Sequence, residues 1–227
     1  MATFDARAPW GIDVAARDGA AFHAVVAGTC WFTTDGHPPR QLVPGDLVLL
    51  PGGARHQLSA EPGLPLRPFD DRLKRELVTD DGELVLPGPG ARTRVLCAGC
   101  GFDADVAQPL LGLLPPVLHV ATAAPEHGPG LRALLDLLAA ECRGRADTGA
   151  DTAAARLLDV LLVHVVRAWL HGTGGPGASW LRGLRDPVVA GALALLHERP
   201  GDPWTLQSLA EAVHVSRATL TRRFGEH

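Results

Sequence analysis

Short apolar runs separated by turn residues fill the first half of the chain. Runs of strand length occur at residues 22–32, 46–51, 83–86 and 94–97, with Asp-Gly, Gly-Gly and Pro-Gly pairs between them. Strands at this spacing are typical of an all-β barrel or sandwich. The stretch 61–89 is rich in Pro, Gly and Asp and predicts that a long loop lies there.

Beyond Pro109 the apolar positions follow helical spacing. One group recurs at positions 131, 134, 135, 138 and 142, and a second at 157, 158, 161, 162, 165 and 169, so each group predicts a helix. The polar segment 143–152 would join these two helices. Residues 187–198 and the stretch from 204 onward are helical by the same criterion, and HGTGGPGAS at 171–179 has the composition of a flexible linker.

These patterns predict an α+β protein in four parts. Residues 1–122 form a β-barrel domain, 123–172 a helical segment, 173–186 a flexible linker and 187–227 a short helical tail. The helix at 157–169 has a broader apolar surface than one buried stripe requires. We therefore expect this segment to pack on the barrel and to build a homodimer interface; packing within one chain only is the alternative.

The helical tail contains the sequence WTLQSLAEAVHVSRATLTRRF at 204–224. Thr205 and Ser216 are placed to cap two helices, and His214 and Val215 form a tight turn between them. Two short helices joined in this way form a helix-turn-helix unit, whose second helix enters the major groove of DNA.

The second predicted helix of the tail has two different faces. Leu220 and Phe224 lie four residues apart and are expected to point inward, while Ala218, Thr221 and Arg222 lie on roughly the opposite side. Arginine can bond a guanine edge or neutralise a phosphate. The alternative is a solvated helical hairpin whose arginines face water.

This tail resembles the first helix-turn-helix of the AraC/XylS family of transcriptional regulators, in which W-T-x-x-x-L-A precedes S-R-x-x-L-x-R-x-F. The resemblance implies a bacterial transcription regulator that binds double-stranded DNA. It further implies that Ala218, Thr221 and Arg222 face bases, whereas Ser216 and Arg217 meet phosphate.

Members of that family carry two such units, and the present sequence reaches His227 just after the first. With few phosphate contacts, the expected DNA affinity is weak at physiological salt. A shortened regulator that keeps the dimerising part and disables full-length partners is a further interpretation.

Within GDLVLLPGGARH, the residues Gly45, Pro51, Gly53 and His56 have the spacing of the second motif of the cupin superfamily, which this segment resembles. A glycine turn leads into an apolar strand, a Pro-Gly turn reverses the chain, and the histidine on the returning strand points into a small barrel. The resemblance implies a cupin-like β-barrel that acts as a sensor domain in front of the DNA-binding unit.

The first cupin motif is incomplete. His23 and Gly36 fit it, but Val25 stands where a second histidine is expected, and Thr29 and Cys30 occupy the glutamate region. Cupin oxygenases and isomerases need three or four inward ligands with open coordination positions. We therefore expect that the protein is not an enzyme; a metal-dependent cupin enzyme with an incidental helical tail is the alternative.

A mixed set of histidines and cysteines lies on the predicted strands. His23, Cys30, His56 and Cys97 suit a closed tetrahedral zinc site if some of them converge inside the barrel. A redox-sensitive thiol centre is a second interpretation. The third is that all four are ordinary core-lining residues.

The CAGC segment at 97–100 makes Cys97 and Cys100 redox candidates. Residues three apart on a continuous strand point to opposite faces, although Gly99 and Gly101 could break the strand. We therefore favour a thiol switch centred on Cys97 over a direct disulfide between the two cysteines.

Composition narrows the classes of function. The 227 residues carry a formal net charge of -4, so any DNA contact depends on a local basic surface. Four cysteines are too few for a disulfide scaffold, and residues 1–10 lack a secretory signal, which predicts reduced thiols and a cytoplasmic location. The most apolar stretch, 157–170, is shorter than the roughly 20 residues of a membrane span. The expected effector is a small molecule, a metal or an oxidant.

Overall fold

The computed structural model describes residues 1–80, 82–100, 114–121, 128–143, 148–171, 183 and 186–226. The chain divides into two compact units, Met1–Ala168 and Trp169–His227. Of the predicted linker 173–186, all positions except Gly183 and Asp186 lie outside the described residues.

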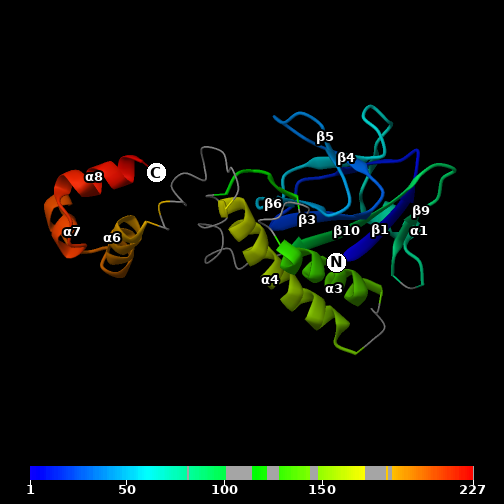
Figure 1. The fold of residues 1–227 in the computed structure, drawn as a ribbon. Helices are drawn as coiled ribbons and strands as arrows, with labels where there is room; N and C mark the ends of the chain where they lie inside the picture. Colours follow the sequence, from blue (N-terminus) through cyan, green and yellow to red (C-terminus); the bar gives the residue numbers. More distant parts are fainter. Residues whose placement is uncertain are drawn as a thin grey trace. The chain divides into compact units, whose positions relative to one another are not determined.

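The first unit contains a six-stranded sheet and a five-stranded sheet that face each other (Figure 1). The six-stranded sheet has the order β11 (Leu118–Ala121), β6 (Asp46–Leu50), β3 (Ala20–Ala27), β10 (Arg92–Cys100), β1 (Ala2–Arg7) and β9 (Leu84–Leu86). The five-stranded sheet has the order β5 (Arg40–Leu42), β4 (Cys30–Thr34), β7 (His56–Ser59), β2 (Gly11–Val14) and β8 (Arg67–Pro68). Together with the helices, these sheets confirm the predicted α+β class.

The main core fills the space between the two sheets, where Phe4, Ile12, Val25, Phe32 and Leu58 are almost fully buried. Inward side chains alternate with outward ones along each strand, as the pleat of a β-strand requires. This alternation brings strands that are distant in the sequence to a common interior.

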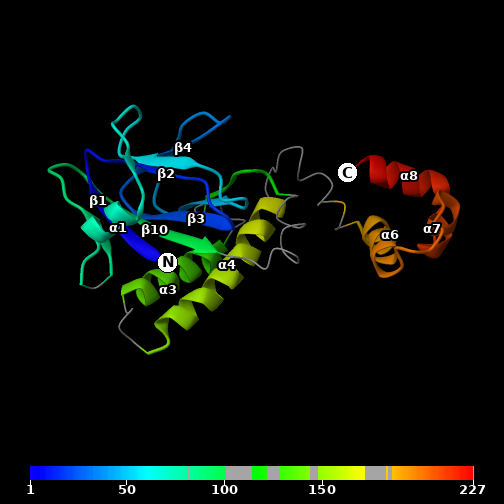
Figure 2. The same cartoon turned by 180° about the vertical axis from the view of Figure 1, so that it is seen from behind.

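Two long helices, α3 (Gly128–Arg143) and α4 (Ala150–His171), cover the outer face of the six-stranded sheet (Figures 1 and 2). Leu158, Leu161 and Val165 of α4 pack near Phe22 and Leu49 of that sheet. Both faces of the sheet are therefore covered, which explains why every residue of β6 is buried and why the four residues after Asp46 form a continuous apolar run. Both helices were predicted from the helical spacing of apolar residues, and the structure confirms them. No helix in the described ranges is long and apolar enough to cross a membrane.

The predicted single strand at 22–32 is wrong, because the chain forms two strands there that belong to different sheets. Gly28 separates β3 from β4 with a φ of 71°, a conformation that glycine adopts without steric cost. A Cβ at this position would lie 2.2 Å from the carbonyl oxygen of Arg92. The turn therefore needs glycine for both its conformation and its close packing.

The predicted long loop at 61–89 contains regular structure. It includes β8, β9 and the helix α1 (Asp71–Leu77), which is capped by the Asp70 carboxylate accepting a hydrogen bond from the backbone N–H of Leu73. Leu73 and Leu77 bury one side of this helix. Two apolar residues in seven were too weak a periodicity to predict a helix.

The second unit is a three-helix cluster of α6 (Pro187–Glu198), α7 (Leu206–Ala212) and α8 (Arg217–Gly225). Thr205 caps α7 and Ser216 caps α8, as predicted. His214 adopts a φ of 57° in the turn between them. Leu220 is fully buried, but the prediction that Phe224 points inward is wrong: it is 39% exposed, because the three short helices close their core around Leu220.

Gly28 and Gly36 provide a matched test of the turn between β3 and β4. Both have positive φ, but nothing lies within 4 Å of a Cβ at Gly36. We expect Gly36→Ala to lower the free energy of unfolding by about 1 kcal/mol, the conformational cost alone. Gly28→Ala should cost at least about twice as much, because the Arg92 carbonyl must also move. Equal losses in urea denaturation would contradict this account of the turn.

Candidate functional site

Two buried histidines from opposite sheets meet in the interior of the first unit. His23 lies on β3 next to Cys97 of β10, and His56 lies on β7 of the other sheet. The Nε2 atoms of the two rings are 2.7 Å apart, and Nδ1 of His23 is 3.1 Å from Sγ of Cys97. A chain of three side chains therefore connects the two sheets.

The proton positions along this series of hydrogen bonds follow from the bond at its His56 end. Nδ1 of His56 is 2.8 Å from the backbone carbonyl of Ala54, which can only accept, so this nitrogen carries the proton. In neutral His56, Nε2 then accepts, so Nε2 of His23 donates to it. Nδ1 of His23 is left as an acceptor for the Cys97 thiol. All three side chains are thus satisfied in their neutral forms.

Burial keeps these groups uncharged. It lowers the pKa of His23 well below its ordinary value, with a further contribution from the neighbouring His56. Burial likewise lowers the pKa of His56, and its hydrogen bond to the Ala54 carbonyl acts in the opposite direction. The Cys97 thiol has a raised pKa for the same reason. The interior is therefore polar but neutral.

The predicted four-residue zinc set does not fit one metal ion in this arrangement. His23 directs its two ring nitrogens to different partners, His56 and Cys97, so these three side chains do not converge on a common point. Cys30 is fully buried in the apolar core, where burial raises its pKa to about 12. In the described part of the chain, no group of three or more His, Cys, Asp or Glu side chains is placed to hold a metal.

The two redox candidates lie on one unbroken strand. β10 continues through Gly99 to Cys100, so the chain does not bend there as a Cys97–Cys100 disulfide requires. Beyond its place at the end of this strand, Cys100 lies outside the described side chains. Cys97 is half-buried and protonated, whereas a reactive thiol needs a lowered pKa. This environment does not favour a thiol switch.

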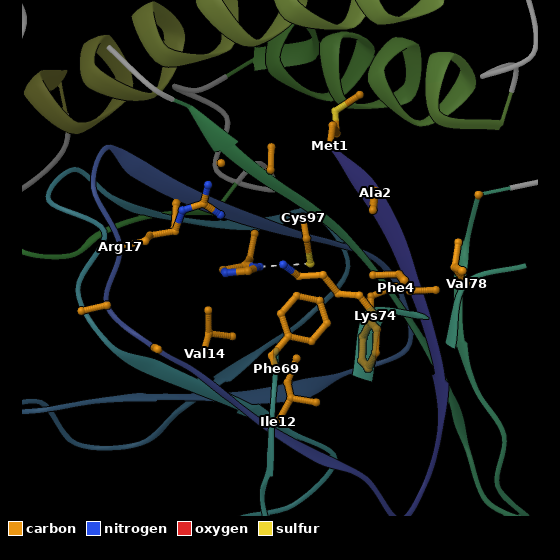
Figure 3. A pocket seen from close by; sticks show the side chains of 18 of the residues that line it. Met1, Ala2, Phe4, Ile12, Val14, Arg17, Phe69, Lys74, Val78 and Cys97 are labelled. Carbon is orange, nitrogen blue, oxygen red and sulfur yellow. Dashed lines mark hydrogen bonds between the residues drawn. The ribbon is translucent and has the colours of Figure 1, made fainter. Parts of the chain in front are cut away.

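A pocket of about 790 Å³ opens between the sheets above the histidine pair. Phe4, Ile12 and Phe69 supply its apolar wall, and Cys97 also lines it (Figure 3). His23 lines the same pocket next to Cys97. Arg17, Asp18, Lys74 and Arg75 are the charged side chains of its wall. Its volume and mixed lining are typical of sites for small organic molecules.

The sequence analysis did not predict most of the residues that form the wall of this pocket. Phe69 and Lys74 lie in the stretch that was predicted to be loop, and α1 carries Lys74 to the pocket. Lys74 is the only lysine of the chain, which was the one available signal. Arg17 lies in a short connection between β2 and β3 with no pattern to mark it.

The glycines of the second cupin-like motif shape the turns around this pocket. Gly45 has a φ of 92° just before β6, and Gly53 has a φ of 58° in the turn between β6 and β7. The carbonyl of Gly53 accepts a hydrogen bond from the backbone N–H of Arg17 at 3.0 Å. A Cβ on Gly53 would lie 2.2 Å from the Arg17 carbonyl, so this glycine fixes the connection that carries Arg17.

The five predicted DNA contacts, Ser216, Arg217, Ala218, Thr221 and Arg222, are all exposed on or next to α8. Arg222 forms an ion pair with Glu226 one turn later, at 2.6 Å.

A link that sequence reasoning missed joins both ends of the three-helix cluster. The Asp186 carboxylate caps α6 and also accepts a hydrogen bond from Arg223 of α8 at 2.9 Å. Arg223 therefore holds α8 against α6.

Comparison with known proteins identifies the family. Residues 1–171 match the cupin family. The chain is 32% identical over 216 residues to an AraC-like transcription regulator of Streptomyces lividans, covering 95% of this chain and 69% of that protein. The chain belongs to the AraC-like transcription regulators. The regulator AlkR of Acinetobacter baylyi is 28% identical over 227 residues, with 95% and 70% covered.

Two solved structures align with most of this chain at low sequence identity. ToxT of Vibrio cholerae strain SCE256 aligns over 99% of this chain and 72% of its own, with 9% identity and a TM-score of 0.43. The AraC-like activator CuxR aligns over 92% and 61%, with 16% identity and a TM-score of 0.30. The relatives named here support the predicted cupin domain with an AraC-type helix-turn-helix.

The neutral histidine pair predicts that stability falls in acid. The folded pKa of each ring is lowered, so the unfolded chain takes up protons first, below about pH 6.5. The free energy of unfolding should then fall by up to about 1.4 kcal/mol per pH unit for each histidine. Urea denaturation between about pH 7.5 and 5.5 measures this slope.

A matched pair of variants assigns that slope to the buried rings. His56→Gln should remove about half of the slope. His37→Gln changes an exposed histidine and should leave it intact. A wild-type stability that stays level below about pH 6.5 would show that the pair is not held neutral.

Proposed function

We propose that this AraC-like regulator binds a small organic effector in the pocket of its first unit and DNA through α8 of its second unit, without catalysing a reaction. The observation that carries the effector assignment is the pocket of about 790 Å³, which is lined by His23, and both ring nitrogens of His23 are already hydrogen-bonded, to His56 and Cys97. Such a lining offers neither a converging ligand set for a metal nor a thiolate for an oxidant.

The exposed face of α8 supports the DNA-binding part of the proposal. Arg217 stands at the start of α8 and has no acidic partner among the described residues, whereas Arg222 pairs with Glu226. Leu220 anchors the opposite face in the core. A helix that is anchored in this way, with the Arg217 guanidinium at its first turn, suits contact with the DNA backbone. Because its target would be the bacterial chromosome, we place the protein in the cytoplasm.

Helix α4 supports the further proposal of a homodimer. Val160 and Val163 are 46% and 53% exposed on the side of α4 away from the sheet, and Leu137 of α3 is 53% exposed. Pairing two copies through these side chains would bring two reading units to neighbouring half-sites and raise their effective concentration.

Arg217→Gln tests the DNA contact. On a random-sequence duplex the wild-type chain should bind weakly, with a Kd in the range of about 10⁻⁴ to 10⁻⁶ M, and the variant should bind less tightly. The slope of log K against log salt should also fall by about 1, because one phosphate contact is lost. Fluorescence anisotropy at several salt concentrations measures both quantities.

Arg156→Gln, which removes the same charge from α4 in the first unit, is the matched control and should bind like wild type. If the two variants lose affinity equally, the effect is general electrostatics and α8 is not the contact. If neither changes the Kd or the slope, the assignment of Arg217 is wrong.

A further inference from the structure

We propose that the effector is an organic anion whose acidic group pairs with Arg17 and whose apolar body lies against Phe4, Ile12 and Phe69. This inference rests on the proposed effector pocket and specifies the chemical class of its ligand.

Arg17 is a pocket cation with no ion-pair partner among the described residues. Within the described residues, no carboxylate lies in ion-pair range of its guanidinium, although its neighbour Asp18 also lines the pocket. Lys74, another cation of the pocket, forms an ion pair with Asp71, with its Nζ 3.0 Å from Oδ1. The same Nζ lies 5.5 Å from the centre of the Phe69 ring. Figure 3 shows Arg17 on one side of the pocket and Lys74 with Phe69 on the other. Arg17 and Arg75 therefore both lack a printed ion pair among the described residues, and Arg17 is the one whose guanidinium is packed against a neighbouring strand, at Gly99.

The neighbouring strand makes room for this guanidinium. A Cβ on Gly99 of β10 would lie 2.4 Å from Cζ of Arg17, so the guanidinium occupies the space that any other residue would fill. The connection that carries Arg17 is held at its other side by Gly53. Two glycines on different elements therefore set the position of one side chain at the pocket wall.

The charge balance of the wall favours an anion. Three basic side chains, Arg17, Lys74 and Arg75, and one acidic side chain, Asp18, line the pocket of a chain whose formal net charge is -4. A cationic cleft on an acidic protein concentrates anions locally.

The two histidines determine which end of the ligand meets Arg17. Both nitrogens of His23 and both nitrogens of His56 are already used in hydrogen bonds. The pocket lining at His23 therefore has no N–H to give to an acidic group, and an anion placed there would lose its hydration without compensation. The apolar body lies against Phe4 and Phe69, whose rings pack edge to face with their centroids 6.5 Å apart and form one apolar wall.

Two fluorescent probes with one skeleton test this proposal. 8-Anilinonaphthalene-1-sulfonate is an organic anion, and N-phenyl-1-naphthylamine is the same molecule without its sulfonate. Both gain fluorescence in an apolar site. The folded wild-type chain should bind the sulfonate at least about tenfold more tightly, because a bond to a charged group adds that much. Competition between the probes shows whether they share one pocket.

Three variants locate the charge that is responsible. Arg17→Gln should weaken the sulfonate at least about tenfold and leave the neutral probe within about twofold. Gly99→Ala should act in the same direction, because its methyl group displaces only the flexible end of Arg17. Arg72→Gln is the matched control, since Arg72 is exposed on α1 and does not line the pocket. An unchanged melting temperature verifies that each variant is folded.

The outcomes separate the two levels of the proposal. Selective loss of sulfonate binding in Arg17→Gln and Gly99→Ala supports the anion assignment. If both probes bind with equal affinity and Arg17→Gln changes neither affinity, that assignment is overturned but the organic effector pocket is retained. If neither probe binds the folded protein, the anion assignment and the effector pocket both fail.

Discussion

The hydrogen bond between His23 and His56 is the interaction on which the interior of the first unit depends. It is buried and 2.7 Å long, and it joins β3 of one sheet to β7 of the other. Its direction is fixed because Nδ1 of His56 must donate to the Ala54 carbonyl. Removing either ring leaves a buried nitrogen unsatisfied, at a cost of about 1–3 kcal/mol. The bond therefore holds the sheets together locally and keeps the pocket lining at His23 neutral.

The turn that supplies His56 also organises the wall of the pocket. Gly53 fixes the connection that carries Arg17, and Gly99 on a different strand leaves space for the Arg17 guanidinium. Residues whose spacing resembles a cupin motif thus shape the turns around the pocket, although no group of metal-ligating side chains forms beside them in the described part of the chain. The same backbone frame can serve either purpose, because the chemistry depends on which side chains the frame carries.

Local patterns predicted the parts of the fold that local physics determines. The apolar run of β6, the helical spacing of α3 and α4, and the capping residues Thr205 and Ser216 all indicated the observed elements. The change of sheet at Gly28 was missed, because the close packing that requires glycine there involves the Arg92 carbonyl, which is distant in the sequence. The sequence suggested that His23, His56 and Cys97 meet inside the barrel. That they form a linear series of hydrogen bonds, and not a cluster around one point, depends on the orientations of the imidazole rings, which sequence spacing does not encode. Arg17 became a candidate only when the fold brought Gly99 to it.

Nitrogen-15 NMR of the histidine rings in the folded protein tests the central claim, a neutral and internally satisfied pair beneath an organic pocket, most directly. The account predicts that near neutral pH His23 carries its proton on Nε2 and His56 on Nδ1. Equimolar zinc should leave both rings unchanged, because no converging ligand set is present among the described residues. A doubly protonated ring, or zinc-induced shifts of the Nε2 signals of both histidines, would contradict the account.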